Sequence, residues 1–534
     1  MGGVFCLKSG TGTIDHYDPI LYTYKSLLDL VKGDYIVNVL IKGIEDERFE
    51  RPLRLIANLF FEESAIHFGT CADPELQVHI QLSTEDNIEA SATLTELSTD
   101  VRHTARYEHG WMPYETEKER FKQLKTAVSH VYLNVLQDLT GIRQKWGILT
   151  GIRPTKLLHK QKQLGVPKEE IHAKLKEEYL ITDEKIQLMQ NIVDRQLSVV
   201  PDLYDLQHEV SIYIGIPFCP TKCAYCTFPA YAILGKQGRV DSFLAGLHYE
   251  VQEMGRWLKE NNVKITTIYY GGGTPTSITA EEMDALYEEM YRSFPDVDSV
   301  REVTVEAGRP DTISPDKLEV LKKWNIDRIS INPQSYTQET LKAIGRHHTV
   351  EETIDKFHLS RNMGMNNINM DLIIGLPGEE TPELQHSLDE TEKLMPESLT
   401  VHTLSFKRAS EMTKNKDKYK VADRVEIEKM MDLAEDWTKR KGYEPYYLYR
   451  QKNILGNLEN VGYALPGQDS LYNIMIMEEV QTIIGIGCGA ASKFIDPKTG
   501  KITHFANPKE PNAYNLGFKE YTDKKIKILN ELFS

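Results

Sequence analysis

The sequence is poor in cysteine and has no long hydrophobic run. Six cysteines in 534 residues are too few for a disulfide scaffold. No apolar stretch approaches the roughly 18 residues that are needed to cross a bilayer. The N-terminal segment lacks the apolar core of a secretory signal, and Cys6 stands where a myristoylation motif has serine or threonine. We therefore expect a cytoplasmic protein without a membrane span.

Runs of lysine or arginine are also missing. The formal net charge is -16, with 63 basic and 79 acidic residues. A nucleic-acid partner usually leaves a basic patch or stripe on a protein, so we expect no nucleic-acid partner here. The apolar share of 40% is that of an ordinary globular protein, and the length predicts roughly three domains.

The first 200 residues combine strand and helix patterns. Alternating and β-branched segments predict strands at 35–43, 51–61, 64–69, 76–83 and 91–97. From Phe121 to Leu139, apolar residues recur at three- and four-residue steps, which predicts an amphipathic helix. Helical patterning continues to about residue 199, interrupted by the loop-like segment GILTGIRPTK at 147–156. We expect residues 1–205 to form an α+β domain, whose role the sequence does not indicate.

Strands and helices alternate regularly in the next part of the chain. Strand patterns occur at 211–216, 266–270, 301–306, 327–332, 367–374 and 399–405. Helical patterns such as 241–260 lie between them, an order that predicts parallel β/α units with right-handed crossovers. The sequence therefore predicts the α/β class, with a partial (β/α)6 TIM-type barrel at 206–440. A smaller α+β domain is expected at 441–534.

Three cysteines are the strongest chemical signal. Cys219, Cys223 and Cys226 follow the strand at 211–216 directly. Thiolates at this spacing can bind three irons of a [4Fe–4S] cluster and leave the fourth iron open. The open iron can chelate S-adenosylmethionine (SAM), whose C–S bond is then cleaved by an electron from the cluster. Structural zinc or an electron-relay cluster would normally need a fourth protein ligand, which no nearby residue supplies.

Polar and glycine-rich segments follow the later strands. Gly271-Gly272-Gly273-Thr274 comes directly after the strand at 266–270, and no Lys-Ser/Thr follows it, which excludes a P-loop. Exposed backbone groups in such a loop suit the methionine end of SAM. Glu306, Gln334 and Asp371 lie at later strand ends, where barrel folds place their active sites. The segment GRHHT at 345–349 has paired histidines, but adjacent side chains point apart, so we do not expect a metal there.

These motifs resemble those of a known family. YIGIPFC, CAYC, GGGTPT, VEAGRPD, INPQS, GRHHT and MDLIIGLPGE occur in this order between about 206 and 495. The pattern is similar to the oxygen-independent coproporphyrinogen III oxidases, which are the coproporphyrinogen dehydrogenases of the HemN-like radical SAM family. The long N-terminal extension resembles the HemZ-type branch of that family.

The resemblance implies a [4Fe–4S] cluster and two SAM molecules. The catalytic set would be the three cluster cysteines with Tyr213. Tyr213, Gly272 and Glu306 would contact the cluster-bound SAM. The contacts to the second SAM would come from Tyr225, Gly273, Thr274, Gln334, Arg346 and Asp371.

The resemblance also implies a reaction. Two propionates of coproporphyrinogen III would be oxidatively decarboxylated to vinyl groups, giving protoporphyrinogen IX in oxygen-independent haem biosynthesis. A flavodoxin- or ferredoxin-like protein would donate electrons to the cluster. The porphyrinogen substrate carries four carboxylates, which call for basic side chains. Candidates from position alone are Arg309, Lys407, Arg408 and Arg450.

Two residues depart from the family pattern. Phe228 stands where the oxidases generally have a fourth cysteine, and Gly215 stands where the family often has histidine. The fourth cysteine is not a cluster ligand, so we expect SAM cleavage to survive its loss, whereas the substrate chemistry stays open. One alternative is a haem-binding chaperone of the radical SAM haem-trafficking type, which also ends its motif in Cys-x-Phe. The other is a haem-degrading radical SAM methyltransferase.

Overall fold

The computed structural model describes residues 36–533, except 62, 152, 229, 234–239, 408–409 and 453. The chain divides into two compact units. The first contains Met1–Thr150 and His172–Ile186, and the second contains Gly151–Ile171 and Gln187–Ser534. Within the described part of the chain, no helix is long and apolar enough to cross a membrane. The three-domain division at 205 and 440 stays a prediction.

The first unit is built on a five-stranded sheet with the order β2-β1-β3-β4-β5. Its strands are β1 (Ile36–Lys42), β2 (Glu63–Phe68), β3 (Leu76–Ser83), β4 (Ile88–Glu96) and β5 (Val101–His109). β1 runs parallel to β2 and β3, and the other pairs are antiparallel. The long helix α3 (Glu117–Thr140) packs on β4 and β5. It begins at a capping box formed by Thr116 and Glu119 and ends at Gly141, whose left-handed conformation stops the helix.

One expected strand of this unit is a helix. Residues 51–61 were predicted as a strand, but α2 (Glu50–Ala57) is helical. Leu53, Ile56 and Ala57 are buried at three- and four-residue spacing, and the intervening Arg54 is exposed. Short apolar runs fit a strand and a helix equally well, and packing against α3 selects the helix. The sequence also gave no signal for β5, because polar residues occupy both of its faces and none of its residues is fully buried.

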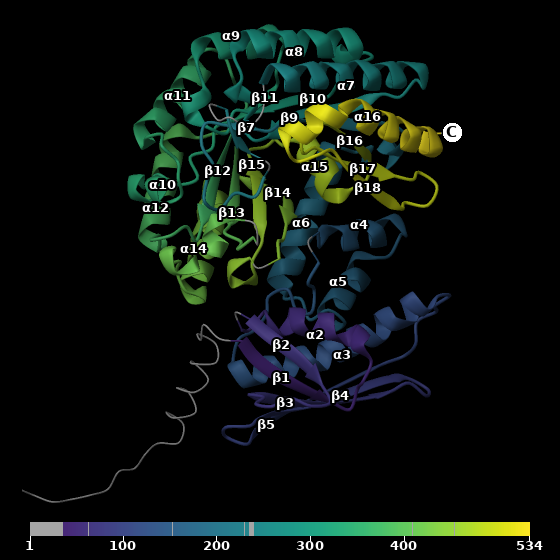
Figure 1. Cartoon of the computed structure of the whole chain (residues 1–534). Helices are drawn as coiled ribbons and strands as arrows, with labels where there is room; N and C mark the ends of the chain where they lie inside the picture. Colours follow the sequence, from purple (N-terminus) through teal and green to yellow (C-terminus); the bar gives the residue numbers. More distant parts are fainter. Residues whose placement is uncertain are drawn as a thin grey trace, which may run out of the picture. The chain divides into compact units, whose positions relative to one another are not determined.

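The second unit contains the predicted β/α units. Its six central strands are β6 (Val210–Ile216), β9 (Ile265–Gly272), β10 (Glu302–Glu306), β11 (Arg328–Ser330), β12 (Ile368–Ile374) and β13 (Ser398–Thr403). They lie side by side in sequence order and are all parallel. The helices between them are α7 (Val240–Glu260), α8 (Ala280–Ser293), α9 (Pro315–Lys323), α10 (Gln338–Ala343), α11 (Val350–Asn362) and α12 (Thr381–Leu394). Figure 1 shows these helices around the outside of the strands, as the predicted partial barrel requires.

Later strands extend the parallel sheet at both edges, to eleven strands in total. Beside β6 lie β16 (Thr482–Gly487), β17 (Ala491–Ile495) and β18 (Ile502–Ala506), of which β16 is parallel to β6. Beside β13 lie β15 (Asn460–Ala464) and β14 (Glu444–Tyr449), both in antiparallel pairs. The other helices and strands are α4 (Thr155–Gln163), α5 (Lys168–Glu177), α6 (Asp183–Val199), β7 (Phe218–Cys219), β8 (Tyr231–Ala232), α13 (Glu411–Lys414), α14 (Arg424–Arg440), α15 (Leu471–Glu478) and α16 (Pro511–Phe533).

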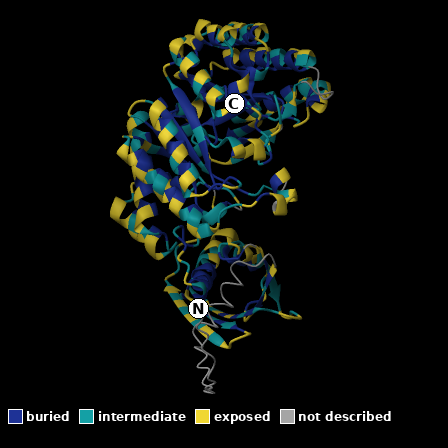
Figure 2. Cartoon of the chain, turned by 90° about the vertical axis from the view of Figure 1, so that its left-hand side faces the viewer, coloured by how far each residue is buried: buried dark blue, intermediate teal, exposed yellow. Residues whose placement is uncertain are grey.

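The central strands are the most buried part of the second unit. Figure 2 shows them in dark blue, with the exposed residues on the outer surfaces of the helices. The C-terminal helix α16 is joined to this core by a fully buried ion pair between Lys525 and Glu250 of α7. Glu250 also accepts a hydrogen bond of 2.7 Å from the backbone N–H of Gly487, at the end of β16. Because each polar atom of this group has a partner, burying it is tolerated.

Candidate active site

The loop that carries Cys219, Cys223 and Cys226, here called the cysteine loop, follows β6 and is hydrogen-bonded to a distant segment of the chain. The amide of Ala224 donates to the carbonyl of Ile344 at 2.9 Å. The hydroxyl of Thr221 donates to the carbonyl of Gly345 at 3.1 Å. The loop that carries the predicted ligands is therefore fixed by the residues that follow α10.

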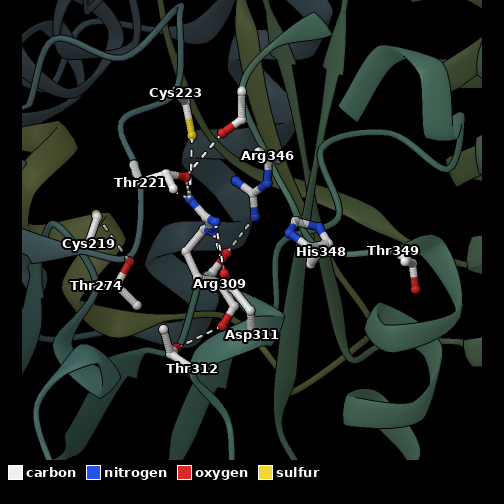
Figure 3. Close-up of polar contacts among 12 residues, drawn as sticks. Cys219, Thr221, Cys223, Thr274, Arg309, Asp311, Thr312, Arg346, His348 and Thr349 are labelled. Carbon is white, nitrogen blue, oxygen red and sulfur yellow. Dashed lines mark hydrogen bonds and ion pairs between the residues drawn. The ribbon is translucent and has the colours of Figure 1, made fainter. Parts of the chain in front are cut away.

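The three cysteines are shielded from solvent to different extents: Cys219 is buried, and Cys223 and Cys226 are partly buried. Cys219 is buried, and its Sγ lies 3.3 Å from Oγ1 of Thr274 (Figure 3). Burial raises the pKa of Cys219 to about 11 and also raises the pKa of Cys226. Thiolates are the form that binds iron, so cluster assembly has to remove protons from these groups.

The donor set fits an iron–sulfur cluster better than a single metal ion. No three His, Cys, Asp or Glu side chains among the described residues converge on one position that could hold a metal ion. A cubane does not need such a position, because each of its thiolate ligands binds a different iron. Three cysteines on one loop, with the other described cysteines, Cys71 and Cys488, elsewhere in the sequence, match a cluster with one open iron.

The glycine-rich loop after β9 packs directly on the cysteine loop. The amides of Gly273 and Thr274 donate to the carbonyls of Ile216 and Phe218, at 2.8 and 2.7 Å. A Cβ atom at Gly273 would lie 2.5 Å from the carbonyl oxygen of Phe218. Only glycine allows this approach, which brings the backbone of the loop against the cysteine loop.

Tyr213 and Glu306 lie on strands of the same sheet with Tyr269 between them. Tyr213 and Tyr269 are register partners on β6 and β9, and their rings stack with centroids 6.1 Å apart. The hydroxyl of Tyr269 donates to Oε1 of Glu306 at 2.5 Å. Burial raises the pKa of Glu306 to about 7. A carboxyl group in this position would be stabilised in its ionised form by a cationic ligand such as the amino group of SAM.

Gln334 and Arg346 have buried polar atoms that no described residue satisfies. Arg346 donates to the carbonyls of Gly308 and Asn332, at 2.9 and 2.6 Å, and lies 3.4 Å from the hydroxyl of Tyr225. Its Nε has no partner, and neither has Oε1 of Gln334. Gln334 also has a left-handed backbone, with φ +68°, and forms an isolated parallel bridge with Leu372 of β12. Unpaired buried groups are costly, so these atoms are suited to a polar ligand.

Asp371 is part of a small polar group on the inner strands. Nε2 of His402 lies 3.5 Å from Asp371, and the amide of Asn369 donates to it at 2.8 Å. Burial acts to raise the pKa of Asp371, but these two neighbours hold it below its usual value. The hydroxyl of Tyr449 lies 3.2 Å from Nδ1 of His402. Asp371 is therefore a carboxylate that is already hydrogen-bonded and negatively charged at neutral pH.

The four basic residues suggested as substrate ligands differ in their surroundings. Arg309 is buried and paired with Asp311 at 2.9 Å. Arg450 is buried and donates to Asn457. Lys407 is partly buried near Cys226, and burial lowers its pKa. Arg408 lies outside the described residues. Neither paired arginine is free for a carboxylate in this arrangement.

Three side chains of the site had no role in the sequence prediction. Tyr269 could have been found, because it precedes the glycine loop and lies in register with Tyr213. His402 lies one residue before the end of a barrel strand, a weaker signal. Tyr472 stacks on Tyr269, with ring centroids 4.3 Å apart, but it comes from α15 and not from a barrel strand. No local pattern in the sequence points to it.

The chain is similar to several known proteins. The model of the Radical SAM superfamily matches residues 213–391. The oxygen-independent coproporphyrinogen-III oxidase-like protein HemZ of Bacillus subtilis (strain 168) is 69% identical over 498 residues, covering 93% of this chain and 99% of HemZ. The heme chaperone HemW of the same organism is 35% identical over 194 residues, covering 36% of this chain and 50% of HemW. The solved structure of coproporphyrinogen III oxidase (HemN) from Escherichia coli has a TM-score of 0.48 and 20% identity, covering 61% of this chain and 72% of HemN.

The strand order, the cysteine loop and the superfamily match define a radical SAM protein, a class that uses a [4Fe–4S] cluster and SAM. Within that class, the chain belongs to the family of HemZ-type, oxygen-independent coproporphyrinogen-III oxidase-like proteins. The predicted family, fold class and cofactors are thereby confirmed.

Proposed function

We propose that this protein oxidatively decarboxylates two propionate side chains of coproporphyrinogen III to vinyl groups, giving protoporphyrinogen IX. The observation that carries the proposal is the 69% identity to HemZ over almost the whole of both chains, which includes the cysteine loop and the glycine loop. Each propionate loses one hydrogen atom, one carbon dioxide and one electron, so the reaction needs an external electron acceptor. A flavodoxin- or ferredoxin-like protein would be the donor that reduces the cluster.

The residues of the chain divide into three sets in this proposal. Cys219, Cys223 and Cys226 hold the cluster. The cluster-bound SAM is contacted by Tyr213, Gly272 and Glu306, and a second SAM by Tyr225, Gly273, Thr274, Gln334, Arg346 and Asp371. When bound, the cluster and SAM supply a radical that abstracts hydrogen.

The protein's own share of the work is positioning and protection. The amides of Gly273 and Thr274 are hydrogen-bonded to the cysteine loop, so the glycine loop is fixed against it and a ligand there meets a rigid surface. The rings of Tyr213, Tyr269 and Tyr472 stack against one another and present an aromatic wall beside Glu306. Such a wall excludes water from the reacting carbon and so protects a radical from side reactions.

A haem chaperone is the second candidate, and two observations favour it. HemW, which is named a heme chaperone, is 35% identical to this chain over 194 residues. Phe228 also occupies the position where the oxidases generally have a fourth cysteine, and its side chain is 56% exposed. A chaperone would bind haem stoichiometrically and would not turn over coproporphyrinogen III.

The deciding experiment is an anaerobic assay of the full chain after reconstitution with iron and sulfide. SAM, dithionite and coproporphyrinogen III are added, and 5′-deoxyadenosine and porphyrin products are followed by mass spectrometry. The proposal expects deoxyadenosine together with monovinyl and divinyl products, and neither when SAM is omitted. Deoxyadenosine without vinyl products, combined with haem bound at one site per chain, would replace the oxidase by the chaperone.

A further inference from the structure

Arg309 occupies a buried position beside the cysteine loop. It lies three residues after the end of β10 and is 3% exposed. Its Nη1 donates a hydrogen bond to Sγ of Cys223 at 3.9 Å (Figure 3). The two residues are 86 positions apart in the sequence. A permanent positive charge therefore lies next to one of the predicted cluster ligands.

Each nitrogen of the Arg309 guanidinium donates a hydrogen bond. Asp311 accepts from Nε at 3.1 Å and from Nη2 at 2.9 Å, which fixes the plane of the group. Thr221 accepts from Nη1 through its hydroxyl at 3.0 Å and through its carbonyl at 3.3 Å. The hydroxyl of Thr221 in turn donates to the carbonyl of Gly345. The guanidinium is thus positioned before any cluster is bound, by Asp311 of its own segment and by Thr221 of the cysteine loop.

This arrangement leaves little of Arg309 for a substrate. The Nε and Nη2 donors are taken by Asp311, and Nη1 is shared between Thr221 and Cys223. A substrate carboxylate would have to displace Asp311, which carries the same charge and is already in a bidentate pair. Besides these oxygen partners, Nη1 of Arg309 donates to the sulfur of Cys223.

We propose that Arg309 is a positioning residue for the iron–sulfur cluster, and that its fixed positive charge next to Cys223 makes the cluster easier to reduce. Hydrogen bonds to the ligand sulfurs and the local net charge set the potential of such clusters. Reduction adds one electron from an external one-electron donor, and a nearby cation stabilises the added negative charge. No bond to Arg309 forms or breaks. The inference rests on the cluster part of the proposed function and not on the porphyrinogen.

The test is a redox titration of the reconstituted full chain, followed by electron paramagnetic resonance without any porphyrinogen present. In Arg309→Gln, we expect the equilibrium constant for reduction to fall about tenfold, which is about 59 mV toward negative potential for a one-electron couple. Arg309→Lys keeps the charge and should shift the potential less. Thr221→Val removes the hydroxyl that holds Nη1 of Arg309. We expect its shift in potential to lie between those of Arg309→Lys and Arg309→Gln.

Arg361→Gln is the matched control. Arg361 also forms a two-point pair with a carboxylate, Glu397, and also donates to a backbone carbonyl, but its partners are outside the cysteine loop. The potential of this variant should equal that of the unmodified protein. An equal shift in Arg361→Gln would mean that the loss of any such pair perturbs the cluster, and it would overturn the proposal.

The other outcomes also decide the matter. An unchanged potential in Arg309→Gln, together with a raised KM for coproporphyrinogen III, would overturn the proposal and return Arg309 to substrate binding. If Arg309→Gln fails to fold or to hold iron, Arg309→Lys and Thr221→Val decide, and unchanged potentials in both would overturn it. A protein that shows the expected shifts but does not turn over coproporphyrinogen III would refute the proposed function and leave the role of Arg309 standing.

Discussion

Tyr269 and Glu306 form a 2.5 Å hydrogen bond across the neighbouring parallel strands β9 and β10. The bond joins a residue that the sequence did not single out to one that it predicted as a SAM contact. Burial raises the pKa of Glu306 to about 7, the nearby Asp371 acts in the same direction, and the bond from Tyr269 acts against both. The charge of Glu306 is therefore expected to change near neutral pH.

The first prediction concerns the pH dependence of stability. The pKa of Glu306 rises from 4.5 to about 7 on folding, so the folded protein binds more protons between these two values. The stability that Glu306 contributes through this proton binding is fully present below about pH 4.5 and is lost as the pH rises through about 7. We expect the free energy of unfolding of the apo protein, relative to Glu306→Gln, to fall by about 1 to 3 kcal/mol over this range. Urea unfolding at several pH values measures it.

Tyr269→Phe is the companion variant for this measurement. It removes the hydrogen bond that favours the ionised form of Glu306, so the loss of stability should move to higher pH. Parallel stability curves for the unmodified protein and Glu306→Gln would contradict the prediction, because they would show that Glu306 titrates alike in the folded and unfolded chains.

The second prediction concerns the cluster ligands. Cys223→Ala removes one of three thiolates, and we expect the iron retained after anaerobic reconstitution to fall by about tenfold or more, with SAM cleavage lost in parallel. Cys71→Ala is the control, because Cys71 is a partly exposed free cysteine of the first unit. The protein with this substitution should retain its iron. Iron and sulfide analysis measures both. Full retention of iron by Cys223→Ala would rule out Cys223 as a ligand.

The third prediction concerns the close approach at Gly273. A methyl group there would lie 2.5 Å from the carbonyl oxygen of Phe218, so Gly273→Ala has to displace the glycine loop from the cysteine loop. Overpacking of this kind costs about 1 to 3 kcal/mol. We expect the dissociation constant for SAM to rise by about tenfold or more, as measured by equilibrium dialysis on the reconstituted protein.

Gly110→Ala provides the matched control for the glycine variant. The nearest atom to a Cβ at Gly110 is Oδ1 of Asn87, at 3.9 Å, so a methyl group fits there without movement. SAM affinity should not change in this variant. An equally unchanged affinity in Gly273→Ala would show that the glycine loop does not form part of the SAM site.

The fourth prediction gives a role to the segment GIRPTK at 151–156. Arg153 and Lys156 both form ion pairs with Glu479 at the end of α15, and Lys493 lies 3.0 Å from the same carboxylate. Burial opposes the charge of Glu479, but these three cations lower its pKa to about 2. The resulting stability is present above about pH 4.5 and is lost as the pH falls toward 2.

Glu479→Gln should therefore lower the free energy of unfolding at neutral pH by about 2 kcal/mol, a value reduced for the partial exposure of the two basic partners. Urea unfolding measures the change. Glu520→Gln is the control, because its pair with Lys524 lies on the exposed face of α16 and should contribute little to stability. Equal stability of the two variants would mean that the segment does not anchor α15.

The sequence was sufficient for the features that depend on neighbouring residues. Each of the six barrel strands was predicted within a few residues of its position, because a buried strand followed by an amphipathic helix leaves a clear change of period. The prediction was wrong at α2, where a run such as LRLIANLFF has no period that separates helix from strand, and β5 was missed because it is not an apolar strand. The identity of the cofactor could also be predicted from neighbouring residues, because three cysteines at this spacing define the ligands of an iron–sulfur cluster.

Tertiary structure alone decided which distant residues act on that donor set. The contacts of Arg309 with Cys223 and of Tyr472 with Tyr269 join residues from different elements, and Glu479 meets Arg153 and Lys156 across more than 300 positions. No periodicity encodes such pairs, because they depend on how helices and loops pack once the sheet has formed. The sequence by itself therefore determined the cofactor chemistry and the parallel scaffold. The packing decided which charges and rings surround the cofactor.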